Sequence, residues 1–377
     1  LNLECGDKTM SYSDSQLESL LFELCSANTT NPPGNEDLAV SIIERTLTRK
    51  EVSVEIHRVA DNRSNLLARI ERDPRISYLV FSGHMDVVPA GSNWNTDPFK
   101  PEQIDGELYA RGSADMKGGL SALIAALVDL SEDREFCGNV ALLATCDEEV
   151  GCSGIQYFLE HKPFDISAVL IGEPTSLGLA TGEKGALWLK LKFRGKSAHG
   201  SQPQNGINAI LKLFRAYSEL SYALGRIEGL TQSLNIIRGG SKENTVPDEA
   251  ECIMDVRFAD NTSSSALEKL VDDVICKYEN SERATLLSRE SFSSSGPLTL
   301  TVKDVLKKQS LSSDKLTMSY FTDGAFTATH GIETVILGPG AASMAHKSNE
   351  YVDLEEVRTA RRLYLEIVKQ FFERTES

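Results

Sequence analysis

Apolar residues recur at two different spacings along most of this chain, and the two spacings alternate. Four leucines lie three or four residues apart behind the sequence Ser13–Gln16, which resembles a capping box, so a helix is expected to begin there. Further helices are predicted at 36–49, 120–131 and 301–308, and from about 353 onward. Strands are predicted at 52–56, 65–70, 76–81, 140–145, 168–171 and 334–337. This alternation predicts an α/β domain built around a mostly parallel sheet.

The order of the predicted elements changes between about residues 183 and 292. This segment reads strand, helix, strand, strand, helix, strand, at 188–193, 205–220, 234–237, 253–258, 266–278 and 284–287. That is the order of a ferredoxin-like unit. We therefore predict two domains in the 377 residues: a discontinuous α/β domain of residues 10–182 and 293–377, and an α+β domain of residues 183–292 inserted into it.

Side chains that can bind a metal follow the predicted strands or precede a helix. They lie in Ser82–Pro89 (SGHMDVVP), Arg111–Gly119, Asp147–Glu149, Gly172–Thr175 and Ala345–Glu350. Each segment alone has an ordinary explanation, since a His-x-Asp after a strand is most often a polar turn and a carboxylate at a Gly-rich helix start is usually an N-cap. In open α/β sheets, however, ligands bind at the carboxyl edge of the strands. The recurrence of these groups at that edge favours one shared site.

These segments contain a set of candidate metal ligands. The set comprises two imidazoles and three carboxylates: His84, Asp115, Glu149, Glu173 and His346. Such donors suit zinc, cobalt or manganese. Five ligands are too many for one tetrahedral site, but they fit two metals about 3.5–4 Å apart with one bridging carboxylate.

Two further acids, Asp86 and Glu148, lie beside this set. Asp86 is two residues after His84, so in an extended chain both side chains point the same way and the carboxylate is placed to orient the imidazole. A surplus acid beside two metals is what amide hydrolysis needs, because it takes a proton from water and returns it to the leaving amine. The long segment 89–112, rich in Gly, Asn, Pro and Asp, is expected to be an ordered functional loop.

Charge and composition restrict the partners. The chain has 55 acidic and 39 basic residues, a net charge of −16, and no Lys/Arg block. This argues against nucleic acid or an anionic membrane as the main partner, and most of the acidity is explained by solubility. Because no apolar run approaches the length of a membrane span and there is no signal-peptide core, a cytoplasmic protein is expected. Met10 precedes the first helix, so residues 1–9 are interpreted as upstream or added sequence.

The seven cysteines also favour a cytoplasmic location. Their number is odd and no C-x-x-C pair occurs, which is typical of reduced thiols rather than a disulfide framework. Cys146 and Cys152 flank the acidic cluster, but small buried hydrophobic residues are the better interpretation for both.

Five motifs together resemble those of the M20 family of co-catalytic metallopeptidases and amidohydrolases. Within that family they resemble the branch of succinyl-diaminopimelate desuccinylases and acetylornithine deacetylases. The motifs are Ser82–Pro89, Asp105–Gly119 (DGELYARGSADMKGG), Asp147–Gly151 (DEEVG), Gly172–Thr175 (GEPT) and His346–Val352 (HKSNEYV). They occur in the order and at the spacing found in the family, and the resemblance covers the chain from residue 13 to its end.

The resemblance implies a role for each residue of the set. Asp115 would bridge two divalent metal ions, Zn²⁺ first and Co²⁺ or Mn²⁺ as alternatives. One ion would also be held by His84 and Glu173, and the other by Glu149 and His346. In addition, Asp86 would orient His84, and Glu148 would be the general base and acid. The peptide bond after Asp115 is often cis in this family.

The inserted domain would act as a lid and as the dimerisation domain of a homodimer. Gly195–Gly200 matches the lid motif of the family, whose histidine, here His199, reaches the partner subunit's active site to stabilise the oxyanion; alone, His199 would be typical of a surface loop. Asn244 and Arg257 match positions that hold the substrate carboxylate, although Arg257 would also fit a salt bridge on a strand face. Gly324 lies in a substrate-side loop, Thr322–Ala325, whose form departs from the best-studied desuccinylases.

The sequence therefore predicts a di-metal hydrolase that cleaves the amide bond of an N-acyl amino acid. N-succinyl-L,L-diaminopimelate, an intermediate of lysine biosynthesis, is the first choice of substrate. Acetylornithine deacetylase, a broader N-acyl-amino-acid deacylase and a dipeptidase with the same metal site are the alternatives. A non-enzymatic, metal-bound module is disfavoured because Glu148, the expected base, is present.

Overall fold

The computed structural model describes residues 12–48 and 50–375, and the predicted start at Met10 lies outside them. The chain forms two compact units. The first comprises the residues up to Thr181, Ser294–Leu316 and the residues from Phe326 onward, and the second comprises Gly182–Ser293 and Thr317–Ala325. The sequence shows no break around Thr317–Ala325 and so predicts that segment as part of the α/β domain, whereas it clusters with the second unit.

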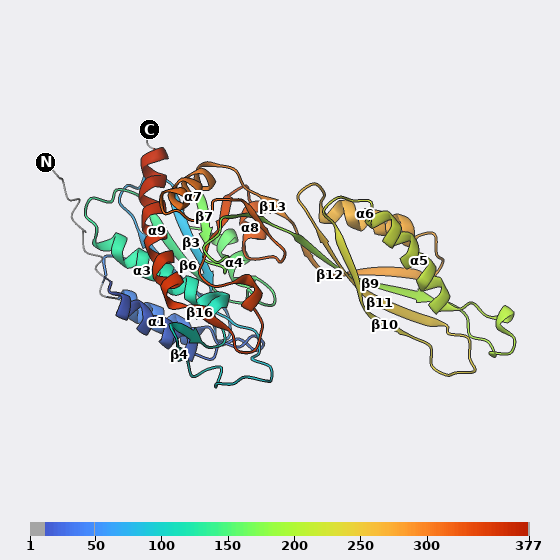
Figure 1. Cartoon of the computed structure of the whole chain (residues 1–377). Coiled ribbons are helices and arrows are strands. Elements are labelled where there is room, and N and C mark those ends of the chain that lie inside the picture. Colours follow the sequence, from blue (N-terminus) through green and yellow to red (C-terminus); the bar gives the residue numbers. More distant parts are fainter. Residues whose placement is uncertain (1–11, 49, 376–377) are drawn as a thin grey trace. The chain divides into compact units, whose positions relative to one another are not determined.

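A mixed sheet with a parallel centre forms the middle of the first unit (Figure 1). Its strands are, in order across the sheet, β1 (Ser53–Ala60), β2 (Arg63–Ile70), β6 (Val140–Thr145), β3 (Tyr78–His84), β7 (Ile166–Ile171), β15 (Glu333–Ile336) and β8 (Ala180–Glu183). The four strands β6, β3, β7 and β15 are parallel, whereas β1, β2 and β8 run antiparallel to their neighbours. The predicted α/β class with a mostly parallel central sheet is confirmed.

Helices cover this sheet and bury its apolar faces. They are α1 (Asp14–Ser26), α2 (Asp37–Leu47), α3 (Gly118–Glu132), α4 (Ser153–His161), α7 (Pro297–Lys308), α8 (Gly324–Thr329) and α9 (Leu354–Thr375). Helix α3 is buried along nearly its whole length, because it packs against β3 and β6 as well as α1 and α9. Each fully buried leucine of this core contributes about 1.5–3 kcal/mol through removal of apolar surface from water.

The first helix begins where the sequence predicts. Ser13 Oγ accepts a hydrogen bond from the backbone N–H of Gln16 (3.2 Å), and Gln16 Oε1 accepts one from the backbone N–H of Ser13 (2.8 Å). This reciprocal pair satisfies two donors that the first helical turn would leave free, so the predicted capping box is confirmed.

A small three-stranded sheet occupies part of the segment predicted as a loop. Its strands are β4 (Glu102–Ile104), β5 (Glu107–Tyr109) and β16 (Tyr351–Asp353), in the order β16-β5-β4. Asp105 and Gly106 both have positive φ, 52° and 89°, as the tight turn between β4 and β5 requires. The loop is therefore ordered, and it is tied to a segment almost 250 residues later in the chain.

The second unit has the β-α-β-β-α-β order expected of a ferredoxin-like unit. Its elements are β9 (Gly185–Arg194), α5 (Ala209–Leu224), β10 (Thr231–Gly239), β11 (Glu249–Phe258), α6 (Ser264–Ile275) and β12 (Ser281–Arg289). The strands form an antiparallel sheet in the order β10-β11-β9-β12, and both helices lie on one face of it (Figure 1). Alternate residues of β9, such as Leu189 and Leu191, pack into the core under the helices. The other face carries charged pairs, such as Lys190 with Glu251 (2.8 Å).

Short elements complete the two units. They are the strands β13 (Phe292–Ser293) and β14 (Leu316–Met318), which pair with β8, and the helical turns η1 (Ser113–Lys117), η2 (Pro203–Asn205) and η3 (Ala342–Met344). Within the described ranges, no helix is both long and apolar enough to cross a membrane. The six cysteines of that part of the chain are free thiols, and Cys146 and Cys152 are buried as expected.

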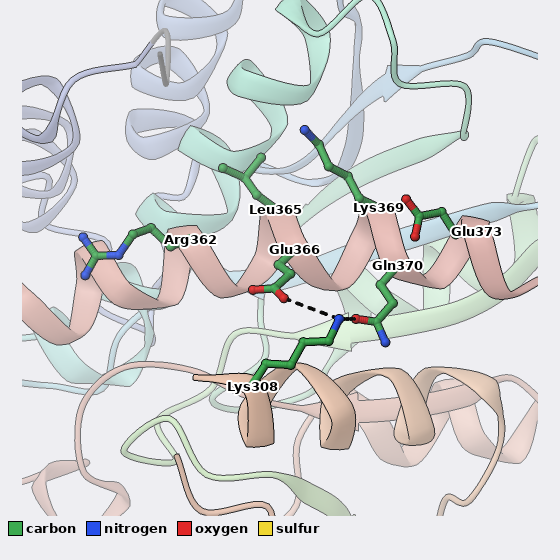
Figure 2. A pocket seen from close by; sticks show the side chains of 7 residues that line it. All are labelled: Lys308, Arg362, Leu365, Glu366, Lys369, Gln370 and Glu373. Carbon is green, nitrogen blue, oxygen red and sulfur yellow. Dashed lines mark hydrogen bonds and ion pairs between the residues drawn. The ribbon is translucent and has the colours of Figure 1, made fainter. Parts of the chain in front are cut away.

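A surface groove lies between α7 and α9 (Figure 2). It is lined by Lys308, Arg362, Leu365, Glu366, Lys369, Gln370 and Glu373. Lys308 Nζ reaches across it and lies 2.8 Å from Gln370 Oε1 and 3.9 Å from Glu366 Oε1. None of the candidate site residues lines this groove, so it is separate from the centre described next.

Candidate metal centre

Parallel strands bring the candidate ligands to one edge of the large sheet. His84 is the last residue of β3, while Glu149 follows β6 and Glu173 follows β7. Because these strands are parallel and adjacent, their carboxyl ends meet at the same edge. Asp115 lies in the turn η1 before α3, and His346 lies in the loop between η3 and β16.

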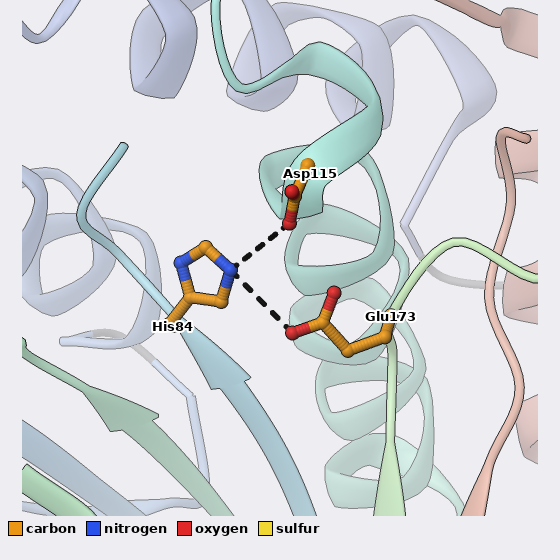
Figure 3. A group of neighbouring side chains, drawn as sticks. All are labelled: His84, Asp115 and Glu173. Atoms are coloured by element: carbon orange, nitrogen blue, oxygen red, sulfur yellow. Dashed lines mark hydrogen bonds and ion pairs between the residues drawn. The ribbon is translucent and has the colours of Figure 1, made fainter. Parts of the chain in front are cut away.

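The five side chains form two groups that share Asp115. The first group is His84, Asp115 and Glu173, and the second is Asp115, Glu149 and His346. In the first group, His84 Nε2 lies 3.2 Å from Asp115 Oδ1 and 3.5 Å from Glu173 Oε1 (Figure 3). In the second, His346 Nε2 lies 3.4 Å from Asp115 Oδ2 and 2.9 Å from Glu149 Oε2. The two oxygens of Asp115 thus face different histidines, as a bridging carboxylate requires.

The electrostatics of these groups fit cation binding. Burial, together with the neighbouring Asp115 carboxylate, raises the pKa of Glu173 well above its usual range and raises that of Glu149 as well. Burial alone would lower the pKa of His84, but the carboxylates of Glu173 and Asp115 raise it well above its usual value. A divalent cation between these oxygens would offset their mutual repulsion. The imidazole and carboxylate donors therefore suit a metal of the zinc, cobalt or manganese type.

The Asp86 carboxylate makes contacts that the sequence did not indicate. His84 Nδ1 lies 2.9 Å from the backbone oxygen of Asp86, whereas the nearest carboxylate oxygen is 3.7 Å away. The carboxylate instead accepts hydrogen bonds from the backbone N–H groups of Glu148 (3.1 Å) and Glu149 (3.2 Å). Asp86 therefore fastens the turn that carries the expected base and one expected ligand, while its carbonyl orients the imidazole.

Asn31 is a buried residue of this site that sequence analysis did not single out. Its side-chain amide donates to Asp86 Oδ2 (2.8 Å) and to Asp147 Oδ1 (3.0 Å). Asp147 in turn has a positive φ of 66° and pairs with Arg63 (3.0 Å). The sequence around Asn31 contains two prolines and a glycine, and so it indicated only a break between two helices.

Two other features of the turn at Asp115 concern its backbone. The peptide bond between Asp115 and Met116 is cis, as the resemblance implied. Gly119, at the start of α3, lies so close to Gly172 that a Cβ there would be 1.8 Å from the Gly172 oxygen. Only glycine permits this approach of the helix to the segment that carries Glu173.

The remaining candidates, His199, Asn244, Arg257 and Gly324, belong to the second unit. His199 and Asn244 lie close together, because His199 bridges to Thr245 and the N–H of Gly200 donates to the Asn244 oxygen (2.7 Å). His199 is exposed, and its Nδ1 accepts a hydrogen bond from the backbone N–H of Ser201 (3.2 Å). In a neutral imidazole this leaves Nε2 as the donor.

Arg257 forms the strand-face salt bridge that was its alternative interpretation. Its Nε lies 2.8 Å from Asp255 Oδ1, and its Cζ lies 5.9 Å from the centre of the Phe321 ring. Its Nη1 is buried and has no hydrogen-bond partner among the described residues. Gly324 lies three residues after Phe321, and a Cβ at Gly324 would be 2.9 Å from the ring of Phe292.

Comparison with known proteins gives consistent results. Residues 80–370 match the family described as "Peptidase family M20/M25/M40". A "Probable succinyl-diaminopimelate desuccinylase" of Staphylococcus aureus (strain MRSA252) is 30% identical in an alignment of 393 positions that covers 91% of this chain and 94% of the relative. An "Acetylornithine deacetylase" of Pectobacterium carotovorum (strain PC1) is 28% identical, and the alignment covers 82% of this chain and 84% of that relative. Among solved structures, a tripeptidase of Staphylococcus aureus superposes with a TM-score of 0.80 at 22% identity, covering 96% of this chain and 99% of that one.

Proposed function

Because the chain belongs to peptidase family M20/M25/M40, and is thus a hydrolase of amide bonds, we propose that it removes the acyl group from an N-acyl amino acid. The observation that carries this proposal is the pair of ligand groups that share Asp115. N-succinyl-L,L-diaminopimelate is the substrate proposed first, and the name of the relative that is 30% identical supports this choice. The reaction would then belong to lysine biosynthesis, and the free thiols are in keeping with a cytoplasmic location.

Two divalent metal ions are the proposed cofactors, Zn²⁺ first, with Co²⁺ or Mn²⁺ also suited to the donors. His84 and Glu173 would hold one ion, Glu149 and His346 the other, and Asp115 would contact both. Such a pair supplies positive charge that polarises the amide carbonyl and lowers the pKa of water.

Glu148 is proposed as the proton carrier of the reaction. It is buried next to the ligand Glu149 and close enough to His84 for its charge to raise the pKa of that imidazole. Glu148 would take a proton from the attacking water and return it to the nitrogen of the leaving amine. Asp86 supports this role, because its carboxylate holds the backbone N–H groups of Glu148 and Glu149.

His199 is proposed to stabilise the negative charge on the former carbonyl oxygen. Its Nε2 is free to carry the proton, since Nδ1 accepts the hydrogen bond from Ser201. A donor aimed at a developing oxyanion typically contributes about 3–4 kcal/mol to the transition state.

Arg257 and Asn244 are proposed to bind the carboxylate of the amino acid, and Gly324 is proposed to belong to the loop on the substrate side of the site. Arg257 of β11 and Arg289 of β12 both pair with Ala186 of the central strand β9. Their side chains therefore lie on the same face of the sheet, opposite the face covered by the helices. Both guanidinium carbons lie within 6 Å of the centre of the Phe321 ring, at 5.9 and 5.8 Å. Two cations around one ring favour an anionic group of the substrate.

A homodimer is proposed in which the second unit provides the interface. Leu211, Phe214 and Tyr222 lie on one side of α5 and are 47–71% exposed. The edge strand β10 adds two more exposed apolar residues, Ile236 and Ile237. An apolar helix stripe beside a free strand edge is suited to pairing with a second copy across a two-fold axis.

A panel of substrates tests the proposed reaction. Purified protein would be assayed with N-succinyl-L,L-diaminopimelate, N-acetylornithine, N-acetylmethionine and several dipeptides, each with added Zn²⁺, Co²⁺ or Mn²⁺. The proposal expects the highest kcat/KM for the succinylated substrate, and an Arg257→Met variant should raise KM for substrates with a free carboxylate. Hydrolysis of dipeptides alone would contradict the proposal.

A further inference from the structure

Glu350 has a position that neither the metal centre nor the proposed chemistry explains. It lies four residues after His346, and none of its surface is exposed. It directly precedes β16, which pairs with β5, the strand that leads toward Asp115. The backbone N–H of Ala110 also donates to the Glu350 carbonyl (3.1 Å). Strand pairing thus holds the loop of one expected ligand against the loop of another.

The Glu350 carboxylate accepts four hydrogen bonds from the segment that carries Asp115, residues 111–115. One oxygen, Oε1, accepts from the backbone N–H groups of Ala114 (2.9 Å) and Asp115 (3.0 Å). The other, Oε2, accepts from the backbone N–H of Gly112 (3.0 Å) and from Nη1 of Arg111. Each oxygen therefore has two donors, and one of the four donors is the backbone N–H of Asp115.

The Arg111 end of this arrangement is also fixed. Its guanidinium lies over the ring of Trp94, with 5.3 Å between Cζ and the ring centre, and Nη2 donates to the Ala90 oxygen (3.3 Å). The side chains of Arg111 and Glu350 are 1% and 0% exposed. This buried ion pair holds a single geometry, because each carboxylate oxygen of Glu350 has two donors and any shift would leave a charge without partners.

We propose that Glu350 is a positioning residue that sets the distance between Asp115 and His346. It would thereby set the affinity with which the second ligand group, Asp115, Glu149 and His346, binds a metal ion. It acts from outside the set of ligands, because it contacts the backbone of Asp115 rather than its carboxylate. This inference rests on the proposed function, since it assumes that Asp115 and His346 share a metal. A merely structural role, closing two loops, would affect stability and leave metal affinity unchanged.

The Glu350→Gln variant tests this role with almost no change in size. A Gln side chain must turn its NH₂ group toward one pair of N–H donors, whichever way it rotates, so two hydrogen bonds are replaced by repulsion. Metal affinity is expected to fall about 10- to 100-fold, as is typical when a group that holds a ligand is changed. Glu350→Asp keeps the negative charge and two acceptor oxygens, so it should lose less affinity than Glu350→Gln.

Glu333→Gln is the matched control. The Glu333 carboxylate likewise accepts backbone hydrogen bonds at the start of a helix, from Leu298 (2.9 Å) and Thr299 (2.8 Å), but it contacts no candidate ligand. Its replacement should lower the unfolding temperature and leave metal affinity unchanged.

Titration of the metal-free proteins with Co²⁺ decides between the two roles. Calorimetry would give stoichiometry and affinity, and the visible absorption of bound Co²⁺ would report the geometry of its ligands. Weaker binding and an altered spectrum in Glu350→Gln, with Glu333→Gln unchanged, would support the inference. Wild-type affinity in Glu350→Gln, or an equal loss in Glu333→Gln, would overturn it. If the wild-type protein itself bound fewer than two ions, the proposed function would fail instead.

Discussion

Two adjacent carboxylates, Glu148 and Glu149, have different expected roles although they follow one another in the same turn. Glu149 Oε2 lies 2.9 Å from His346 Nε2, and Glu149 belongs to one of the two candidate ligand groups that share Asp115. Glu148 belongs to neither of these two groups. In the proposed reaction, Glu149 would supply a ligand charge to a metal and Glu148 would transfer the proton. Substituting each in turn separates the two roles.

The Glu148→Gln variant is expected to keep its metals but to lose about 10²–10⁴ in kcat, because an amide cannot accept the proton of water. Glu149→Gln should instead lower metal affinity, since it removes a charged ligand. Steady-state kinetics at saturating metal, together with metal content after gel filtration, separates these effects. A near-normal kcat in Glu148→Gln would refute the assignment.

Asp86→Asn tests what the Asp86 carboxylate does. The variant retains the backbone carbonyl that lies 2.9 Å from His84 Nδ1, so binding by His84 should change little. The carboxamide cannot accept from Glu148, Glu149 and Asn31 at once, so the turn should loosen and kcat should fall about 10- to 100-fold. Metal affinity and kcat would be measured on the same samples. A loss of affinity without a loss in kcat would favour the orienting role expected from the sequence.

At the scale of elements, the strands of the parallel centre could be predicted, whereas the short elements could not. Apolar runs such as 76–81 and 140–145 are long enough to be recognised, and each is followed by a ligand candidate. The three-residue strands β4, β5 and β16 are too short to show an alternation. The helices α4 and α8 were also not predicted, because each is under ten residues long.

Long-range contacts explain why parts of the site were missed. Glu350 lies 235 positions from Asp115 in the sequence, and no local pattern indicates that the two are hydrogen-bonded. The same holds for Asn31, 55 positions from Asp86. The five candidate ligands could be found because each directly follows a recognisable strand or belongs to a motif. Glu350 and Asp86 lie within two of these motifs, but nothing in the motifs indicates which distant backbone N–H groups their carboxylates contact.

Strand β8 contains a buried acid that should make stability depend on pH. Burial raises the pKa of Glu183 to about 8, the nearby Asp323 carboxylate adds to this effect, and the hydrogen bonds donated by Thr322 oppose it. The unfolded chain would release this proton near the ordinary value of 4.5. Between about pH 4.5 and 8 the folded protein thus binds the extra proton, so the free energy of unfolding falls as pH rises.

Glu183→Gln cannot titrate and should remove this contribution. Relative to the wild-type protein, the variant should become more stable as pH rises from 5 to 8, by several kcal/mol if Glu183 is the only group changed. Urea unfolding of both proteins at pH 5 and pH 8 gives the comparison. A stability difference between the two proteins that does not change with pH would contradict the assignment.

At the scale of the whole molecule, the proposed homodimer makes a prediction about shared sites. If His199 serves the neighbouring subunit, then His199→Ala and Glu148→Ala variants, each inactive alone, should rescue one another when mixed. A mixed dimer has one intact site and one site that lacks both groups. Random pairing gives about half mixed dimers, so activity should return to about a quarter of that of the wild type.

The control for this experiment is a mixture of Glu148→Ala and Glu148→Gln, in which no pairing restores a complete site. Subunit exchange would be followed with fluorescent labels on the two proteins. If exchange occurred and activity did not return, His199 would act in its own subunit or outside the reaction.

If two metal ions share Asp115, the number of bound ions and the activity should rise together when metal is restored. Metal-free protein would be titrated with Zn²⁺ or Co²⁺, and bound metal and turnover would be measured at each step, for the wild-type chain and for Asp115→Ala. The wild-type chain should bind about two equivalents at full activity and lose all turnover after chelation, and Asp115→Ala should lose both ions. Full activity in metal-free protein, or two tightly bound ions in Asp115→Ala, would contradict the sharing of Asp115 by two metal ions.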